Sequence, residues 1–282
     1  MIKIIIELTK LRLSLLVAFS ATFGFILASS EGINYIDLFF LFFGGWLITS
    51  SSIINNQILE KDSDSLMKRT MKRPIPTKRI SVKTSMIISL LFSFIGFLIL
   101  YYFLNFYTAF LSILSLIVYS FVYTPLKKIS SIAVFIGAFP GALPPLIGWV
   151  AATNQISIEA IIIFSIQFIW QFPHFWAIAW VSDEDYKKAG FRLLPNGGGK
   201  NFSTAINIMT YTLILLPLGL LPTIFGITGL MSGFVAILCG VLFLIQTINL
   251  IKDFSKKSAL RVMIGSFIYL PIVQISYILD KI

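Results

Sequence analysis

Charge is scarce in this sequence, and cysteine is almost absent. Of the 282 residues only 12% are charged, whereas 57% are hydrophobic, and the mean hydropathy is +0.91. A soluble domain carries about 25% charged residues, so the composition excludes a soluble globular protein and indicates a chain that lies in a bilayer. The single cysteine, Cys239, lies inside an apolar run. It excludes a disulfide framework and a cysteine metal cluster, and we expect it to pack between helices.

Long apolar runs take the place of the missing charge. A helix that crosses the roughly 30 Å hydrocarbon core needs about 20 apolar residues. The runs of that length predict an all-α polytopic membrane protein with about nine spans and no large domain outside the bilayer. The predicted spans are residues 11–28, 36–59, 82–104, 106–124, 131–152, 158–181, 203–223, 229–250 and 259–279.

The Lys and Arg residues fall almost entirely on one side of these spans. All but one of the 22 lie before the first span, in even-numbered connections or within three residues of the span ends beside them, and only Lys281 lies on the other side. Because cytoplasmic loops are enriched in Lys and Arg, we expect the N-terminus in the cytoplasm and the C-terminus outside. The lack of an Arg-rich transit segment favours a bacterial inner membrane. We attribute the net charge of +10 to this topology and to anionic lipid, not to nucleic-acid binding.

The polar loop after the second span carries the first candidate site. Asn56, Glu60 and Asp64 recur every four residues, so on a helix they share one face. Amide and carboxylate oxygens are ligands that suit Mg²⁺ bridging a phosphate group. Arg69 and Arg73, which follow, can bind phosphate oxygens. The alternative is a solvated helix end whose acids pair with neighbouring bases.

A second polar loop follows the sixth span. The span contains His174, the only histidine in the chain, which is either a packing residue or a functional one. Asp183, Glu184 and Asp185 come next, with Tyr186 after them. These carboxylates form a second oxygen-rich cluster on the same side of the membrane as the first. Two such clusters followed by basic residues are the pattern expected for a diphosphate held through Mg²⁺.

A third candidate is the pair Tyr123 and Lys127, with Lys128 beside it. If the helix continues past Thr124, the phenol and the ammonium group share a face and can reach a phosphate oxygen. Tyr and Lys anchors at a membrane interface are the ordinary alternative. The next span is rich in helix breakers, which a membrane tolerates only where they are buried against protein or line a cavity. These are Gly137, Pro140, Gly141, Pro144, Pro145 and Gly148.

These motifs resemble those of the intramembrane prenyltransferases, the family that includes hydroxybenzoate polyprenyltransferase. The acidic motif reads Asn56-x3-Glu60-x3-Asp64, and the motif Tyr-x3-Lys begins at Tyr123. Glu60 stands where the family usually has aspartate, and the second Asp-x3-Asp pattern is absent. Further segments are similar to the haem-farnesylating branch of the family, the haem O synthases. They are Asn55-Asn56-Gln57, Met67-Lys68-Arg69-Thr70, Arg73-Pro74, Gly141-Ala142-Leu143-Pro144-Pro145, Gly148-Trp149, Trp170-Gln171-Phe172-Pro173-His174, Asp185-Tyr186 and Ala189-Gly190.

The resemblance implies one prenyltransferase domain over residues 1–282, with its helices around a central cavity open to the cytoplasmic side. The implied substrates are farnesyl diphosphate and haem b, the product is haem O, and Mg²⁺ is the cofactor. Haem A synthase or terminal-oxidase assembly is the implied partner. The implied metal ligands are Asn56, Glu60, Asp64 and Asp185, which with Tyr123 and Lys127 are also the catalytic candidates. The implied substrate-binding residues are Arg69, Arg73, Lys128, His174 and Tyr186.

Other functions remain open at this point. A prenyltransferase acting on another aromatic or quinone-precursor acceptor would share the acidic motifs. A secondary transporter can also carry broken helices, but its polar sites usually lie near the midplane and its halves repeat. A structural assembly factor would leave both acidic clusters unexplained.

Overall fold

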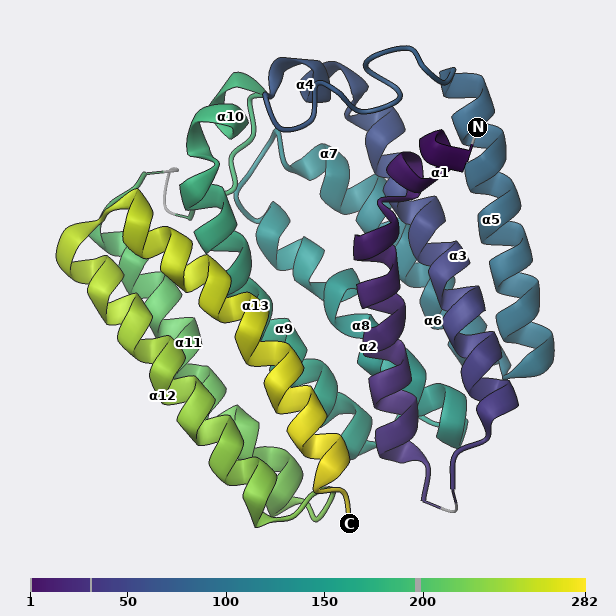
Figure 1. Ribbon diagram of the computed structural model, residues 1–282, viewed down its shortest axis with the longest axis vertical. Helices are drawn as coiled ribbons and strands as arrows, with labels where there is room; N and C mark the ends of the chain where they lie inside the picture. Colours follow the sequence, from purple (N-terminus) through teal and green to yellow (C-terminus); the bar gives the residue numbers. More distant parts are fainter. Residues whose placement is uncertain (1, 31, 196–198) are drawn as a thin grey trace.

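Long apolar helices run from end to end of the molecule in the computed structural model, which describes residues 2–30, 32–195 and 199–282 (Figure 1). Within these ranges nine helices are long and apolar enough to cross a membrane. The nine predicted spans are therefore confirmed, with ends that differ by at most a few residues. The helices are α2 (Leu11–Ala28), α3 (Tyr35–Leu59), α5 (Val82–Phe103), the composite helix Phe106–Leu126, α8 (Ala133–Thr153), α9 (Ile158–Val181), α11 (Phe202–Ile224), α12 (Leu230–Asp253) and α13 (Lys256–Leu279).

Short helices gather at the end of the molecule where the chain begins. They are α1 (Ile2–Thr9), α4 (Lys61–Leu66) and α10 (Asp183–Lys188), and the C-terminus lies at the opposite end (Figure 1). An odd number of crossings requires this separation of the termini. The described ranges hold no strand pairing beyond an isolated bridge between Thr228 and Lys281. The Lys281 ammonium also donates to the carbonyl of Ile26 at 3.0 Å, which ties the chain end to α2.

Two groups of helices flank a central pair. α8 and α9 pack on each other; α2, α3, α5 and α6 (Phe106–Ile117) lie on one side, and α11, α12 and α13 on the other (Figure 1). Many of the long helices start at a Ser or Asn whose side chain accepts a hydrogen bond from an N–H of the first turn, which satisfies a donor that lacks an intrahelical partner. The capping residues are Asn34, Ser81, Asn105, Ser157, Asn201 and Ser255.

Helix α8 stays helical through three prolines, and neighbouring side chains satisfy two of the carbonyls that these prolines release. A proline cannot donate to the carbonyl four residues earlier, so Pro144 releases the carbonyl of Pro140 and Pro145 releases that of Gly141. Ser115 donates to the first at 3.2 Å, and the amide of Gln167 donates to the second at 2.8 Å. The expectation that this span is buried against protein is met, because most of it is buried.

Glycines let α2 and α8 approach closely. A Cβ on Gly148 would lie 1.8 Å from the carbonyl oxygen of Ala21, and one on Gly24 would lie 1.9 Å from that of Pro145. Contacts this short leave no room for any side chain. Small residues at a crossing are the usual means of close helix packing in a membrane, where burial of apolar surface gives no driving force.

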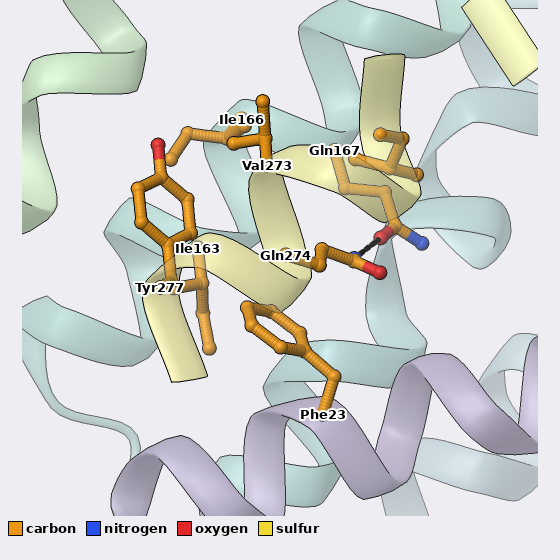
Figure 2. A pocket seen from close by; sticks show the side chains of 8 residues that line it. Phe23, Ile163, Ile166, Gln167, Val273, Gln274 and Tyr277 are labelled. Atoms are coloured by element: carbon orange, nitrogen blue, oxygen red, sulfur yellow. Dashed lines mark hydrogen bonds between the residues drawn. The ribbon is translucent and has the colours of Figure 1, made fainter. Parts of the chain in front are cut away.

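A buried polar network joins α2, α9 and α13 beside this crossing. The side-chain oxygen Oε1 of Gln167 accepts hydrogen bonds from the hydroxyl of Ser20 and from the side-chain amide of Gln274, both at 3.0 Å. Figure 2 shows the two glutamines beside a narrow apolar space that includes the ring of Phe23 and the phenol of Tyr277. The network fastens the last spanning helix to the first at a depth where unpaired polar groups are costly.

Candidate active site

The acidic face of the first polar loop forms as the spacing predicts. The N–H of Glu60 donates to the carbonyl of Asn56 at 2.9 Å, and the N–H of Asp64 donates to that of Glu60 at 2.7 Å. Helical hydrogen bonding thus continues across the junction of α3 and α4 and keeps the three side chains on one face. Asn56, Glu60 and Asp64 are 3%, 5% and 0% exposed. A solvated helix end is therefore the wrong interpretation, because its acids would face water.

Each of the two buried carboxylates is paired with a base. Glu60 forms an ion pair with Lys127 from the distant Tyr-x3-Lys motif. Arg73 donates through Nη1 to both carboxylate oxygens of Asp64, at 2.8 and 2.6 Å. Burial raises the pKa of the Asp64 carboxyl, although the charge of Arg73 opposes the rise. The charges at the site are thus balanced within the protein itself.

The Tyr-x3-Lys motif sits on an irregular turn of helix. A π-helix, η1 (Val118–Tyr123), precedes α7 (Thr124–Leu126), and the N–H of Lys127 donates to the carbonyl of Tyr123 at 3.3 Å. The helix therefore does continue past Thr124. The Lys127 ammonium lies 4.7 Å from the centroid of the Tyr123 ring, and the hydroxyl of Thr124 accepts from the amide of Asn56 at 3.1 Å. The sequence did not predict the π-helix, a feature that is frequent at functional sites.

The two polar loops meet, as α4 and α10 lie side by side (Figure 1). The backbone N–H of Arg69 donates to a carboxylate oxygen of Asp185 at 3.4 Å. The guanidinium of Arg69 donates to the hydroxyl of Tyr186 at 3.3 Å and lies 5.7 Å from the centroid of that ring. The acidic residues of both loops thus stand at one end of the bundle with basic residues between them.

Several acidic and basic residues of the loops stand apart from this arrangement. Asp62 and Glu184 are exposed, and so is Lys128, for which the described ranges give no side-chain contact with the acidic groups. Asp183 is buried but pairs with Lys187 at 2.9 Å and with Lys200 at 3.4 Å. In the structure Asp185 contacts the first polar loop, whereas Asp183 forms ion pairs with two lysines of the second loop.

The side chains expected to bind the metal lie at the same end of the bundle, but they do not converge on one point. In the described part of the chain, no three acidic, His or Cys side chains stand close enough together to hold a metal ion. The donors nonetheless fit Mg²⁺ chemically, since two buried carboxylates and an amide oxygen line one helical face. A buried carboxylate needs a cation beside it, and here Lys127 and Arg73 supply that charge.

His174 lies deeper than the acidic face, between α9 and α13. Its Nδ1 contacts the hydroxyl of Ser266 at 2.8 Å, and its ring stacks on Trp170 with centroids 4.5 Å apart. Seven residues separate it from the end of α9 at Val181, a depth of about 10 Å along a helix that rises 1.5 Å per residue. The histidine is therefore buried in the helix bundle rather than exposed in the polar loop.

Lys10 is a site residue that the sequence analysis missed. It joins α1 to α2 in a left-handed backbone conformation with φ of 46°. The pKa of its ammonium is lowered to about 7, chiefly by burial and also by the charges of Arg73 and Lys127, while the charges of Asp64 and Glu60 oppose the shift. Lys10 therefore stands within electrostatic range of both ion pairs. In the sequence it is simply one more basic residue before the first span, and nothing distinguishes it from a topological signal.

Comparison with known proteins identifies close relatives along nearly the whole chain. Residues 17–270 match the model of the UbiA prenyltransferase family. A protein of Cytophaga hutchinsonii named protoheme IX farnesyltransferase is 54% identical over 98% of this chain and 96% of its own length. A protein of the same name from Flavobacterium psychrophilum is 45% identical over 98% of this chain and 93% of its own.

Solved structures share the fold at low sequence identity. A structure described as digeranylgeranylglyceryl phosphate synthase superposes with a TM-score of 0.83 at 20% identity, covering 99% of this chain and 98% of its own. A UbiA homologue from Archaeoglobus fulgidus, bound to GPP and Mg²⁺, superposes with a TM-score of 0.69 at 14% identity, covering 97% of this chain and 99% of its own. At these identities the likeness concerns the arrangement of the helices.

Proposed function

This chain belongs to the UbiA prenyltransferase family, and we propose that it transfers the farnesyl group of farnesyl diphosphate to a vinyl group of haem b. Water adds in the same reaction, and the products are haem O and diphosphate. The name that its relatives carry supports this acceptor. The pairing of Glu60 with Lys127 and of Asp64 with Arg73, beside Asp185, is the structural observation that carries the proposal.

The paired charges suit a site that binds a metal diphosphate. Mg²⁺ binds carboxylates, while Arg and Lys bind phosphate oxygens, so a magnesium diphosphate offers each member of both ion pairs a new partner. Asn56, Glu60, Asp64 and Asp185 would hold the metal, which when bound neutralises charge on the leaving diphosphate. The archaeal homologue bound to GPP and Mg²⁺ supports this use of a divalent cation in the family.

The basic residues of the site stabilise the leaving group. Lys127 and Arg73 turn from the carboxylates to the diphosphate oxygens, and Arg69 binds from the side of Asp185. Tyr123 donates its phenolic hydrogen to an oxygen of the same group. Negative charge develops on the diphosphate as the allylic C–O bond breaks, so these donors stabilise the transition state more than the ground state.

The acceptor then forms the new bond. The electron pair of the C–O bond leaves with the diphosphate, and the π electrons of the haem vinyl group form a C–C bond to the farnesyl cation. The carbon next to the porphyrin, now a cation, takes water and releases a proton to give the hydroxyethylfarnesyl group. His174 and Tyr186 are the residues we assign to substrate binding at this stage, and Lys128 stays a weaker candidate because its side chain is exposed.

A small pocket on the membrane side of the acidic face marks a path for the prenyl chain, which would have to widen it. It lies between α2, α3, α6 and α8, and small or apolar side chains such as Ala18, Ala21, Gly45 and Ile147 line it. On α3 the wall of the cavity at Thr49 lies seven residues before Asn56, so a chain anchored by its diphosphate at the acidic face can extend into this space.

The loops that carry the site face the cytoplasm in this proposal, because they hold most of the Lys and Arg residues. The N-terminus then lies in the cytoplasm and the C-terminus outside, in a bacterial inner membrane. Haem O would pass to haem A synthase or to terminal-oxidase assembly.

The proposal is tested with the detergent-purified protein. Haem b, farnesyl diphosphate and Mg²⁺ are supplied with and without EDTA, and mass spectrometry detects the product. We expect an EDTA-sensitive haem that carries a farnesyl group and one water. Asp64→Asn should abolish the product in a folded protein, whereas Asp62→Asn, an exposed acid of the same loop, should retain it. Prenylation of a phenolic acceptor without any haem product would overturn the substrate, and a haem product unaffected by EDTA would overturn the metal.

A further inference from the structure

Ser266 in α13 contacts two aromatic residues of α9 at once. Its backbone carbonyl accepts a hydrogen bond from the indole N–H of Trp170 at 2.9 Å, and its hydroxyl contacts Nδ1 of His174 at 2.8 Å. Ser266 is fully buried. Since the two helices meet here through hydrogen bonds to a single residue, the position of Ser266 fixes both rings relative to α13.

The direction of the histidine bond follows from the second bond of the serine. The hydroxyl of Ser266 donates its hydrogen to the carbonyl of Met263 at 2.6 Å. A hydroxyl has one hydrogen, so while it donates to Met263 it accepts from His174. In that arrangement Nδ1 of His174 carries the hydrogen, and in a neutral imidazole the lone pair lies on Nε2.

Two neighbouring rings hold the imidazole in place, and among the described residues none pairs with Nε2. Trp170 stacks on the imidazole at an interplanar angle of 19°, and Phe267 meets it edge-on with centroids 4.7 Å apart. Within the described ranges, Nε2 has no hydrogen-bond partner. It is also not fully buried, so a ligand can reach it. A ring fixed on one nitrogen and open on the other is arranged like a metal-binding histidine, whose second nitrogen usually donates to a protein oxygen.

We propose that Ser266 is a positioning residue, which holds His174 in the Nδ1–H tautomer so that the Nε2 lone pair can bind the iron of the haem acceptor. The inference rests on the proposed function and deepens it by assigning the group that orients the acceptor. His174 would touch the iron, whereas Ser266 acts only through His174. No electron or proton is transferred, since a neutral imidazole binds iron through its lone pair.

The test compares Ser266→Ala with a matched serine of the same helix. Ser276 makes the same kind of bond, from its hydroxyl to the carbonyl of Val273 at 2.8 Å, so Ser276→Ala controls for loss of a helix hydroxyl. Haem b is titrated into each full-length variant in detergent without prenyl diphosphate, and absorption and resonance Raman spectra report the axial ligand. Binding of inorganic pyrophosphate with Mg²⁺ is measured separately, because it reports the acidic face alone.

We expect Ser266→Ala to weaken haem binding by about 10- to 100-fold, the usual cost of removing a partner of a metal-binding histidine. The nitrogen-ligand signature should weaken, and KM for haem should rise more than kcat falls. Ser266→Thr keeps a hydroxyl and should restore binding. Ser276→Ala should behave as the unaltered protein, and pyrophosphate binding should be unchanged in all variants. In a His174→Ala background, Ser266→Ala should have no further effect on haem affinity.

Other results overturn the inference in distinguishable ways. If Ser266→Ala lowers thermal stability but leaves the haem spectrum and affinity unchanged, the bond is structural. If the protein makes haem O but His174→Ala keeps the same haem spectrum, the iron assignment is wrong while the proposed function stands. If the unaltered protein prenylates only a phenolic acceptor, the proposed function falls and the inference with it.

Discussion

Glu60 and Lys127 form a buried ion pair between two helical segments that are far apart in the sequence. Their side chains are 7% and 8% exposed, respectively, so neither charge is solvated well enough to stand alone. The pair connects the acidic motif to the Tyr-x3-Lys motif and keeps the site neutral before substrate arrives.

Removing one or both charges of this ion pair should distinguish its contribution to stability from its contribution to activity. Lys127→Met leaves Glu60 buried without a counter-charge, which is expected to cost about 3–5 kcal/mol of unfolding free energy. The double variant Glu60→Gln with Lys127→Met should recover most of that loss but no turnover, because both diphosphate-site groups are gone. Thermal unfolding and product formation measure the two quantities. An active double variant would exclude both residues from the chemistry.

Arg73 should matter for diphosphate binding beyond its pairing with Asp64. Replacing it with Gln removes charge-assisted hydrogen bonds, which are worth about 1.5–3 kcal/mol each, so KM for farnesyl diphosphate should rise by about 10- to 100-fold. Arg79, which pairs with Glu7 at the exposed surface, provides the control. Arg79→Gln should leave KM unchanged. Equal effects of the two variants would point to net charge rather than to a specific contact.

Lys10 should give the protein two opposite pH dependences. Its folded-state pKa of about 7 lies below that of a free lysine, so between pH 7 and about 10 the unfolded state binds more protons and stability rises with pH. We expect pyrophosphate to bind more tightly while Lys10 carries its positive charge, so affinity should fall as pH rises above 7. Thermal unfolding and pyrophosphate titrations across this range measure both trends. Lys10→Met should remove this rise in stability and flatten the affinity, and unchanged slopes would contradict the assignment.

Gly137 should be essential for the placement of the Tyr123 ring. A Cβ at this position would lie 2.7 Å from two carbons of that ring. Gly137→Ala therefore forces the phenol to move, at an expected cost of about 1–3 kcal/mol, and we expect turnover to fall with it. Gly219→Ala is the control for a methyl group added to a packed helix outside the site, since a Cβ there would lie 3.1 Å from the Cβ of Ala236 in α12; it should keep normal turnover. Thermal unfolding and turnover of both variants provide the measurement; normal turnover in Gly137→Ala would remove Tyr123 from the mechanism.

The fold could be predicted from the sequence as far as local patterns determine it. The nine spans follow from hydropathy, because each helix satisfies its own backbone in the bilayer. The shared face of Asn56, Glu60 and Asp64 follows from the helical repeat, and so does the adjacency of Tyr123 and Lys127. The glycines and prolines of α8 predicted a span that is buried against protein or lines a cavity, because carbonyls freed by proline need partners, and most of the span is buried.

The pairings across the site depended on tertiary structure. The sequence placed both acidic loops on one side of the membrane, but only packing decided that Asp185 joins Arg69 while Asp183 pairs with lysines of its own loop. The electrostatic coupling of Lys10 also needed the fold, because only helix packing brings its charge within range of the two ion pairs.

The sequence by itself determined that the protein lies in a bilayer, where its spans are and which kinds of side chain form the site. These features follow from composition and from helical periodicity, which are local properties of the chain. Only the tertiary structure decided which charge neutralises which, and which oxygen holds the ring of His174. Those choices depend on contacts between residues far apart in the chain, such as His174 and Ser266. Such contacts depend on how whole helices pack, and no local pattern in the sequence specifies that packing.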